Sequence, residues 1–116
     1  MIKELLIADY LKPYYVIVRS RDASPSEITA AEELQRYLMK ICSSHFPVIT
    51  DEAAPTQKEI VIGKTNRKDD IDLNELGDDG FVIKTVGERI FIVGSRTRGT
   101  LYGVYQFLEE YLGCRF

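Results

Sequence analysis

The sequence predicts an α/β domain in which a mixed β-sheet and two main helices form an α+β two-layer sandwich. Short runs of β-branched and aromatic residues are separated by polar loops, and two longer segments repeat apolar residues at helical spacing. The expected order of elements is β-α-β-β-β-β-α. All 116 residues are expected to form one domain, with residues 1–12 as an extension and residues 14–116 as the α/β domain.

The first half of the chain is expected to contain a strand, a helix and a second strand. Residues 14–19 are a continuous apolar run, which is typical of a strand that is covered on both faces. Ser24 is a helix cap, Pro25 takes the first helical position, and Glu27 completes a capping box. This helix continues to about residue 43, and residues 46–50 form the next strand. The three elements therefore predict a right-handed crossover between parallel strands.

The next three strands complete the sheet. Residues 59–63 are again a continuous apolar run. Residues 80–86 and 89–93 are separated only by Gly87 and Glu88, a pair that suits a type II′ hairpin turn. These last two strands are therefore expected to be antiparallel, and the sheet is expected to be mixed.

The C-terminal helix is apolar over more than one face. It is expected from about Thr97 to Leu112, and Leu101, Val104, Leu108 and Leu112 fall on one stripe at helical spacing. Four aromatic residues lie outside that stripe: Tyr102, Tyr105, Phe107 and Tyr111. Such a helix is normally buried on more than one side, whereas one sheet covers only one side. The sequence thus indicates a piece of a larger protein, the rest of which covers the helix.

The same region carries a resemblance to a known family. Residues 98–105 read Arg-Gly-Thr-Leu-Tyr-Gly-Val-Tyr, residues 107–109 read Phe-Leu-Glu, and residues 112–116 read Leu-Gly-Cys-Arg-Phe. This pattern resembles the end of the N-terminal domain that precedes the catalytic barrel in family 67 α-glucuronidases. Related versions precede the barrel in β-N-acetylhexosaminidases. The resemblance extends from about Tyr14 to Phe116, and it points to large bacterial proteins.

The resemblance implies a hexosaminidase N-terminal-domain-like fold and an accessory role. In such proteins the catalytic carboxylates lie downstream in the barrel, so no catalytic residue, metal or cofactor is expected in this chain. The expected partner is the downstream catalytic barrel of the same chain, against which the last helix packs. The parent protein is then a glycoside hydrolase of carbohydrate metabolism. Similar proteins are often exported to the periplasm or cell surface, and the sequence leaves the compartment open.

The residues expected to contact a neighbouring domain or a sugar lie in and around the last helix. Tyrosines are favoured at interfaces, and their rings also stack on sugars. One alternative is therefore a carbohydrate-binding module that uses these tyrosines, and another is a homodimer of the isolated domain through its apolar helix. The candidate residues are Arg96, Arg98, Tyr102, Tyr105, Tyr111 and Phe116.

A third alternative is a small anion or phosphate site in the loop of residues 94–99, because helix N-terminal amides attract anions. Gly94 and Gly99 have the spacing of a phosphate-binding loop. However, Thr100 and Leu101 stand where that motif requires lysine and serine or threonine. The sequence of this loop instead predicts that Ser95 or Thr97 caps the helix. Gly99 and Gly103 are four residues apart, which predicts close packing of that helix face.

The composition and charge of the chain disfavour several other classes of function. The net charge of −3 and the pI of about 5.2 give no basic surface for nucleic acid. No apolar run reaches the ~20 residues of a membrane span, and residues 1–10 do not form a signal peptide. Adjacent acids such as Asp51 and Glu52 are expected to be solvated. Whether Cys42 and Cys114 pair is left open.

Overall fold

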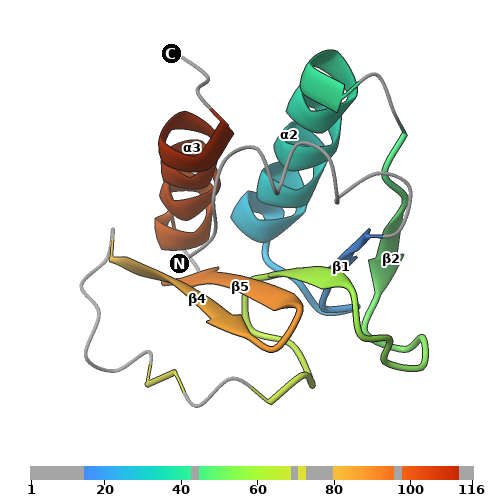
Figure 1. Ribbon diagram of the computed structural model, residues 1–116. Helices are drawn as coiled ribbons and strands as arrows, with labels where there is room; N and C mark the ends of the chain where they lie inside the picture. Colours follow the sequence, from blue (N-terminus) through green and yellow to red (C-terminus); the bar gives the residue numbers. More distant parts are fainter. Residues whose placement is uncertain (1–14, 43–44, 69–70, 73–79, 96–97, 113–116) are drawn as a thin grey trace.

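In the computed structural model, a five-stranded sheet carries two helices on one face (Figure 1). The structure describes residues 15–42, 45–68, 71–72, 80–95 and 98–112. The predicted order of elements is confirmed. The elements are β1 (Val16–Arg19), α2 (Pro25–Cys42), β2 (Val48–Thr50), β3 (Glu59–Ile62), β4 (Phe81–Val86), β5 (Arg89–Gly94) and α3 (Gly99–Leu112). The predicted extension and Gly113 lie outside the described residues.

The sheet is mixed, as predicted, and its strand order is β2-β1-β3-β5-β4. β1 pairs in parallel with both β2 and β3, and β3 pairs in parallel with β5. Only β4 is antiparallel to its neighbour β5. Val86 lies opposite Arg89, so the turn has two residues, and Gly87 has the positive φ of +62° that such a tight turn requires.

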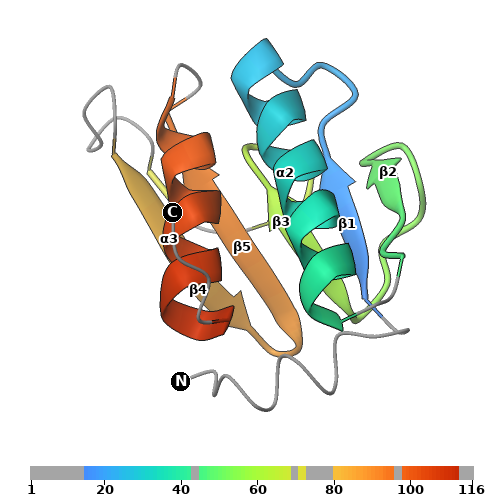
Figure 2. The same cartoon turned by 90° about the horizontal axis from the view of Figure 1, so that it is seen from above.

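Helix α2 begins with the predicted capping box. The Ser24 backbone N–H donates to Glu27 Oε1 over 2.8 Å, and the Glu27 N–H donates to Ser24 Oγ over 3.2 Å. The helix then returns along the sheet to β2, which completes the crossover from β1. Because α3 also starts where a parallel strand ends, the two helices run side by side in the same direction (Figure 2).

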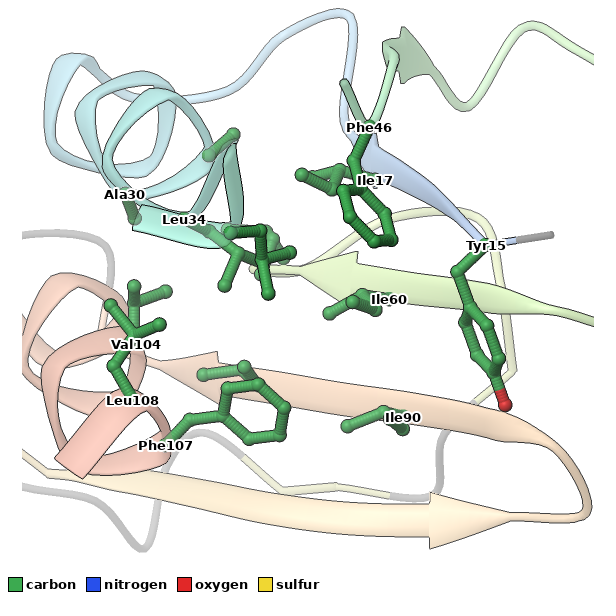
Figure 3. Close-up of a cluster of buried hydrophobic side chains, with 14 residues drawn as sticks. Tyr15, Ile17, Ala30, Leu34, Phe46, Ile60, Ile90, Val104, Phe107 and Leu108 are labelled. Atoms are coloured by element: carbon green, nitrogen blue, oxygen red, sulfur yellow. The ribbon is translucent and has the colours of Figure 1, made fainter. Parts of the chain in front are cut away.

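The main core lies between the helices and the sheet. Figure 3 shows side chains from α2, α3 and the central strands converging in this layer. The inward face of α3 differs from the predicted stripe, because Phe107 is fully buried while Leu101 is only partly buried. Thr100 and Gly103 also face inward. An aromatic residue that the spacing placed outside the stripe is therefore part of the core.

Gly103 allows α3 to pack closely on the sheet, as its spacing from Gly99 predicts. A Cβ at this position would lie 2.8 Å from Ile92 Cγ2 and 3.3 Å from Phe81 Cβ. Ile92 belongs to the central strand β5, and Phe81 belongs to the edge strand β4. The glycine therefore sets how close the helix can approach both strands.

The second face of the sheet is also buried. Val18, Val61, Phe91 and Val93 form a separate apolar cluster on this face, and Ile71 packs against it. Ile71 belongs to the segment between β3 and β4, so a described part of this segment packs on the side of the sheet opposite the helices. The prediction that the first strand is covered on both faces is thus confirmed.

A buried ionic cluster continues the second face beyond the apolar residues. Glu59 lies two residues before Val61 on β3, so both side chains point to this face. The Glu59 carboxylate is fully buried and accepts hydrogen bonds from Arg67 Nε (3.1 Å), Arg67 Nη2 (3.0 Å) and Arg89 Nε (2.9 Å). The Thr56 N–H donates to it as well, over 3.1 Å. These bonds connect β3, β5 and both loops that flank β3.

The hydrogen bonds outweigh the cost of burial in setting the charge of Glu59. Burial by itself would raise the pKa of this carboxyl group, but the bonds from Arg67, Thr56 and Arg89 lower it below its ordinary value of 4.5. Arg67 itself is buried, and its guanidinium also donates to the carbonyls of Asp51 and Ala53. The Glu59 carboxylate is therefore ionised at neutral pH, and both of its oxygens accept hydrogen bonds.

Substitution of Gly103 by alanine is expected to destabilise the domain. Alanine favours an isolated helix by ~1 kcal/mol, but overlap with Ile92 costs about 1–3 kcal/mol. Chemical denaturation would measure the free energy of unfolding. Gln106→Ala, on the same helix, is the control and is expected to stay within about 0.5 kcal/mol of wild type. A Gly103→Ala protein more stable than wild type would contradict the close packing.

Substitution of Glu59 by glutamine is expected to lower the free energy of unfolding by about 3–5 kcal/mol, because two arginines lose their buried counter-charge. Glu88→Gln is the matched control. It removes the exposed Lys58–Glu88 ion pair, which has an N–O distance of 3.5 Å, and should cost at most ~1 kcal/mol. Equal losses in the two variants would contradict the structural role of the cluster.

Acid should remove the contribution of Glu59 to the free energy of unfolding. Its pKa is lowered by folding, so the contribution is fully present above the ordinary pKa of 4.5 and is lost as pH falls through the lower folded-state pKa. Between neutral pH and this acidic range, wild type should therefore lose more stability than Glu59→Gln. Urea titrations at several pH values would measure this, and equal pH dependence in both proteins would be evidence against it.

Candidate functional site

The N-terminus of α3 is closed by hydrogen bonds within the domain. The Gly99 N–H donates to Ser95 Oγ over 3.1 Å, so Ser95 caps the helix as one of the two predicted candidates. The Gly94 N–H donates to the fully buried Thr100 Oγ1 over 2.9 Å. The Ser95 N–H donates to the Gly80 carbonyl over 3.1 Å. These three amides are thus used inside the protein and do not point at a ligand.

The glycines of this loop serve close packing. A Cβ on Gly94 would lie 2.6 Å from both the Gly80 carbonyl oxygen and the Thr100 nitrogen. A Cβ on Gly99 would overlap the same Gly80 carbonyl. The spacing that resembled a phosphate-binding loop therefore has a different physical cause, which is the close contact between the start of β4 and the start of α3.

Two of the candidate tyrosines lie on the outer side of α3. Tyr102 has 41% of its surface exposed, which makes it one of the most exposed large apolar residues among those described. Tyr105 is half-buried and its hydroxyl donates to Glu33 Oε1 of α2 over 3.1 Å. The ring of Tyr102 is therefore accessible, whereas the Tyr105 hydroxyl bonds the two helices together.

This contact continues across α2. Arg36 donates to both Glu33 oxygens, over 2.8 and 3.1 Å, and its guanidinium carbon lies 4.6 Å from the centre of the Tyr37 ring. We name this surface the helix-face strip. It consists of Tyr102 and Tyr105 from α3 and Glu33, Arg36 and Tyr37 from α2. The strip joins an exposed ring to a charged pair across both helices.

The charges of the strip depend on one another. The hydrogen bonds from Arg36 and Tyr105 outweigh partial burial and lower the pKa of Glu33. Burial and the neighbouring Glu33 carboxylate both raise the pKa of Tyr105. Glu33 is therefore ionised at neutral pH and the Tyr105 hydroxyl keeps its proton.

The remaining candidates are placed only in part. Arg98 is exposed at the start of α3. Arg96 and Phe116 lie outside the described residues, and the backbone of Tyr111 belongs to α3 while its side chain is not described. The structure thus brings together Tyr102 and Tyr105, and the other predicted members of the surface stay predictions.

Sequence reasoning missed a set of buried carboxylates. Asp51 was expected to be solvated, but it is buried because Oδ1 accepts the Arg21 N–H over 3.2 Å and Oδ2 accepts the Asn66 N–H over 3.0 Å. Its neighbour Glu52 is exposed, as expected. Among the described residues, the other two buried carboxylates are Glu27 and Glu59. Only the capping-box pattern of Glu27 gave a sequence signal for any of the three.

Metal binding finds no support among the described residues, where no three or more histidine, cysteine, aspartate or glutamate side chains are grouped to hold an ion. In the same part of the chain, neither helix is long and apolar enough to cross a membrane.

Comparison with known proteins agrees with the resemblance seen in the sequence. Residues 7–107 match the family described as "Glycosyl hydrolase family 67 N-terminus". Alpha-glucuronidase A of Aspergillus tubingensis is 33% identical over 101 residues, which is 84% of this chain and 12% of the relative. A probable alpha-glucuronidase A of Aspergillus niger is 32% identical over 101 residues, with the same coverage.

A probable alpha-glucuronidase A of Aspergillus clavatus is 28% identical over 104 residues, or 85% of this chain and 12% of the relative. The chain thus spans about an eighth of the length of these relatives. They are fungal, so the bacterial origin indicated by the sequence resemblance stays a prediction. Because the family match covers most of the chain, this protein belongs to the family of N-terminal domains of family 67 glycosyl hydrolases.

Proposed function

We propose that this chain is a non-catalytic N-terminal domain of a glycoside hydrolase and that it supports a catalytic barrel downstream in the same polypeptide. The family to which it belongs is defined as an N-terminus, and its relatives are named as alpha-glucuronidases. The activity of the parent protein would then be carried by the barrel. The docking surface would be the helix-face strip, with Tyr102 as its central ring.

The state of the buried carboxylates supports a non-catalytic role. A glycosidase needs two carboxyl groups that face a substrate, one as acid and one as base or nucleophile. Here every oxygen of the three buried carboxylates accepts a hydrogen bond from the protein itself. The donors are backbone amides for Glu27 and Asp51, and arginines with one amide for Glu59. These groups act as internal cross-links.

The exposed ring of Tyr102 is the observation that carries the docking role. Tyrosine is enriched at protein interfaces because a large ring is buried there at little entropic cost. The Tyr105–Glu33 bond holds α2 and α3 together beside it, so the two helices would present one rigid surface. A rigid surface loses little conformational freedom when it binds.

Carbohydrate binding is the second candidate, and the same exposed ring favours it. It would depend on Tyr102, because the hydroxyl of Tyr105 is already bound to Glu33. A homodimer of the isolated domain would also cover this surface. Anion binding at residues 94–99 ranks below both, since the amides of Gly94, Ser95 and Gly99 are used within the domain.

The test compares Tyr102→Arg with Met39→Arg, because Met39 is equally exposed, at 43%, but lies outside the helix-face strip. In the isolated domain both changes should alter the free energy of unfolding by less than about 0.5 kcal/mol. In a protein that carries the downstream barrel, Tyr102→Arg alone should weaken the coupling between the domains by at least ~1 kcal/mol. Equal effects of the two variants there would rule out docking through Tyr102.

Two further results separate the alternatives. Binding of plant glycans that disappears in Tyr102→Ala would favour the carbohydrate-binding module. Self-association of the isolated domain that disappears in Tyr102→Arg would favour the homodimer. A gene with a stop codon directly after the codon for Phe116 would contradict the accessory role itself.

A further inference from the structure

Open α/β sheets have a crevice outside the carboxyl ends of adjacent strands at a topological switch point, and the neighbouring parallel strands β1 and β3 form such a point here. From β1 the chain passes through α2 to β2, on one side of β1 in the sheet, whereas from β3 it leads on to β4 and β5, which lie on the other side. Adjacent parallel strands whose connections diverge in this way form a topological switch point. In open α/β sheets, ligands bind at the carboxyl ends of the strands at such a point.

In this domain the crevice is occupied by the side chain of Glu27. This residue is 1% exposed, although glutamate is almost never fully buried unless it is paired. Oε1 accepts the Ser24 N–H over 2.8 Å, and Oε2 accepts the Lys64 N–H over 3.3 Å. The two donors belong to different elements, the loop before α2 and the segment after β3. The carboxylate is thus held between the two elements that frame the crevice.

The chain on the other side of the crevice is shaped to receive this carboxylate. Gly63 has a φ of +76°, which favours glycine, and a Cβ there would lie 2.8 Å from Glu27 Cδ. The Gly63 N–H donates to the Ile92 carbonyl over 2.8 Å, which fixes this backbone on β5. Space that a side chain of residue 63 would take is therefore filled by the carboxyl group of Glu27.

We propose that the Glu27 carboxylate is a built-in ligand that fills the switch-point crevice and locks the segment after β3 onto α2. The position is suited to a small carboxylate, since a carboxylate is already seated there on backbone amides from two elements. In the natural chain the crevice is consequently closed to external ligands. Removal of the side chain would leave a site for formate or acetate. This inference does not depend on the docking role of Tyr102.

The experiment uses Glu27→Ala with sodium formate as the probe and sodium chloride at the same ionic strength as the reference. Formate should raise the melting temperature of Glu27→Ala in a saturable way, because a ligand that binds only the folded state stabilises it. Wild type should show no such rise. Glu32→Ala is the matched control, since Glu32 lies on the same helix and is exposed, and it should also show none.

The result tests the proposal whether or not the Glu27→Ala variant folds. A folded Glu27→Ala that responds to formate no more than Glu32→Ala overturns it. If Glu27→Ala unfolds, recovery of the fold in formate but not in chloride supports the proposal, and failure to recover overturns it.

A second measurement tests the lock without creating a cavity. In Glu27→Gln the amide hydrogen of Lys64 should exchange at least about tenfold faster than in wild type, because a charged acceptor is replaced by a weaker neutral one. The amide of Asn66, which donates to Asp51 instead, should exchange at an unchanged rate. Unchanged exchange at Lys64, or equal acceleration at both amides, would show that the carboxylate does not lock this segment.

Discussion

The domain depends on one constraint: its central strands bury apolar side chains on both faces, while both helices lie on the same face. The helix side is closed by a conventional core. On the other side Ile71, from the segment between β3 and β4, packs against the apolar cluster, and the described residues of this segment have little regular structure of their own. Such a segment stays in place only if it is fastened. The bonds of Arg67 to Glu59 and those of Asn66 to Asp51 fasten its first part.

The three buried carboxylates therefore share one physical role. Each joins segments that are distant in the sequence: Glu27 joins α2 to the loop after β3, Asp51 joins three loops, and Glu59 joins β3 to β5 and to both loops that flank β3. Buried acids often indicate catalysis, but a catalytic acid needs an oxygen directed at the substrate. The outer side of the two helices carries the exposed ring of Tyr102, through which we propose that the domain docks. This distribution agrees with a family defined by its N-terminal position in much longer proteins.

Much of the fold followed from local sequence patterns. The apolar runs gave the strands, Ser24 and Glu27 gave the start of α2, and Gly87 gave the hairpin. The predicted stripe of α3 supplied Val104 and Leu108 to the core, with Leu101 packed against it, but the place of Phe107 in the core was not predicted, because a helix rich in leucine and aromatic residues fits more than one stripe. The ionic cluster could not be predicted, since Glu59 meets Arg89 across 30 residues and the pairing depends on strand order. The exposed ring of Tyr102 likewise depends on the final rotation of the helix.

The most direct test of the account is hydroxyl-radical footprinting of Tyr102, performed on the isolated domain and on a protein in which the domain precedes a catalytic barrel. Each residue is compared with itself in the two proteins, and Met39 serves as the exposed reference. The account predicts that Tyr102 reacts readily in the isolated domain and is protected in the longer protein, while Met39 reacts equally in both. Equal reactivity of Tyr102 in both proteins would contradict the claim that the helix-face strip is a domain interface.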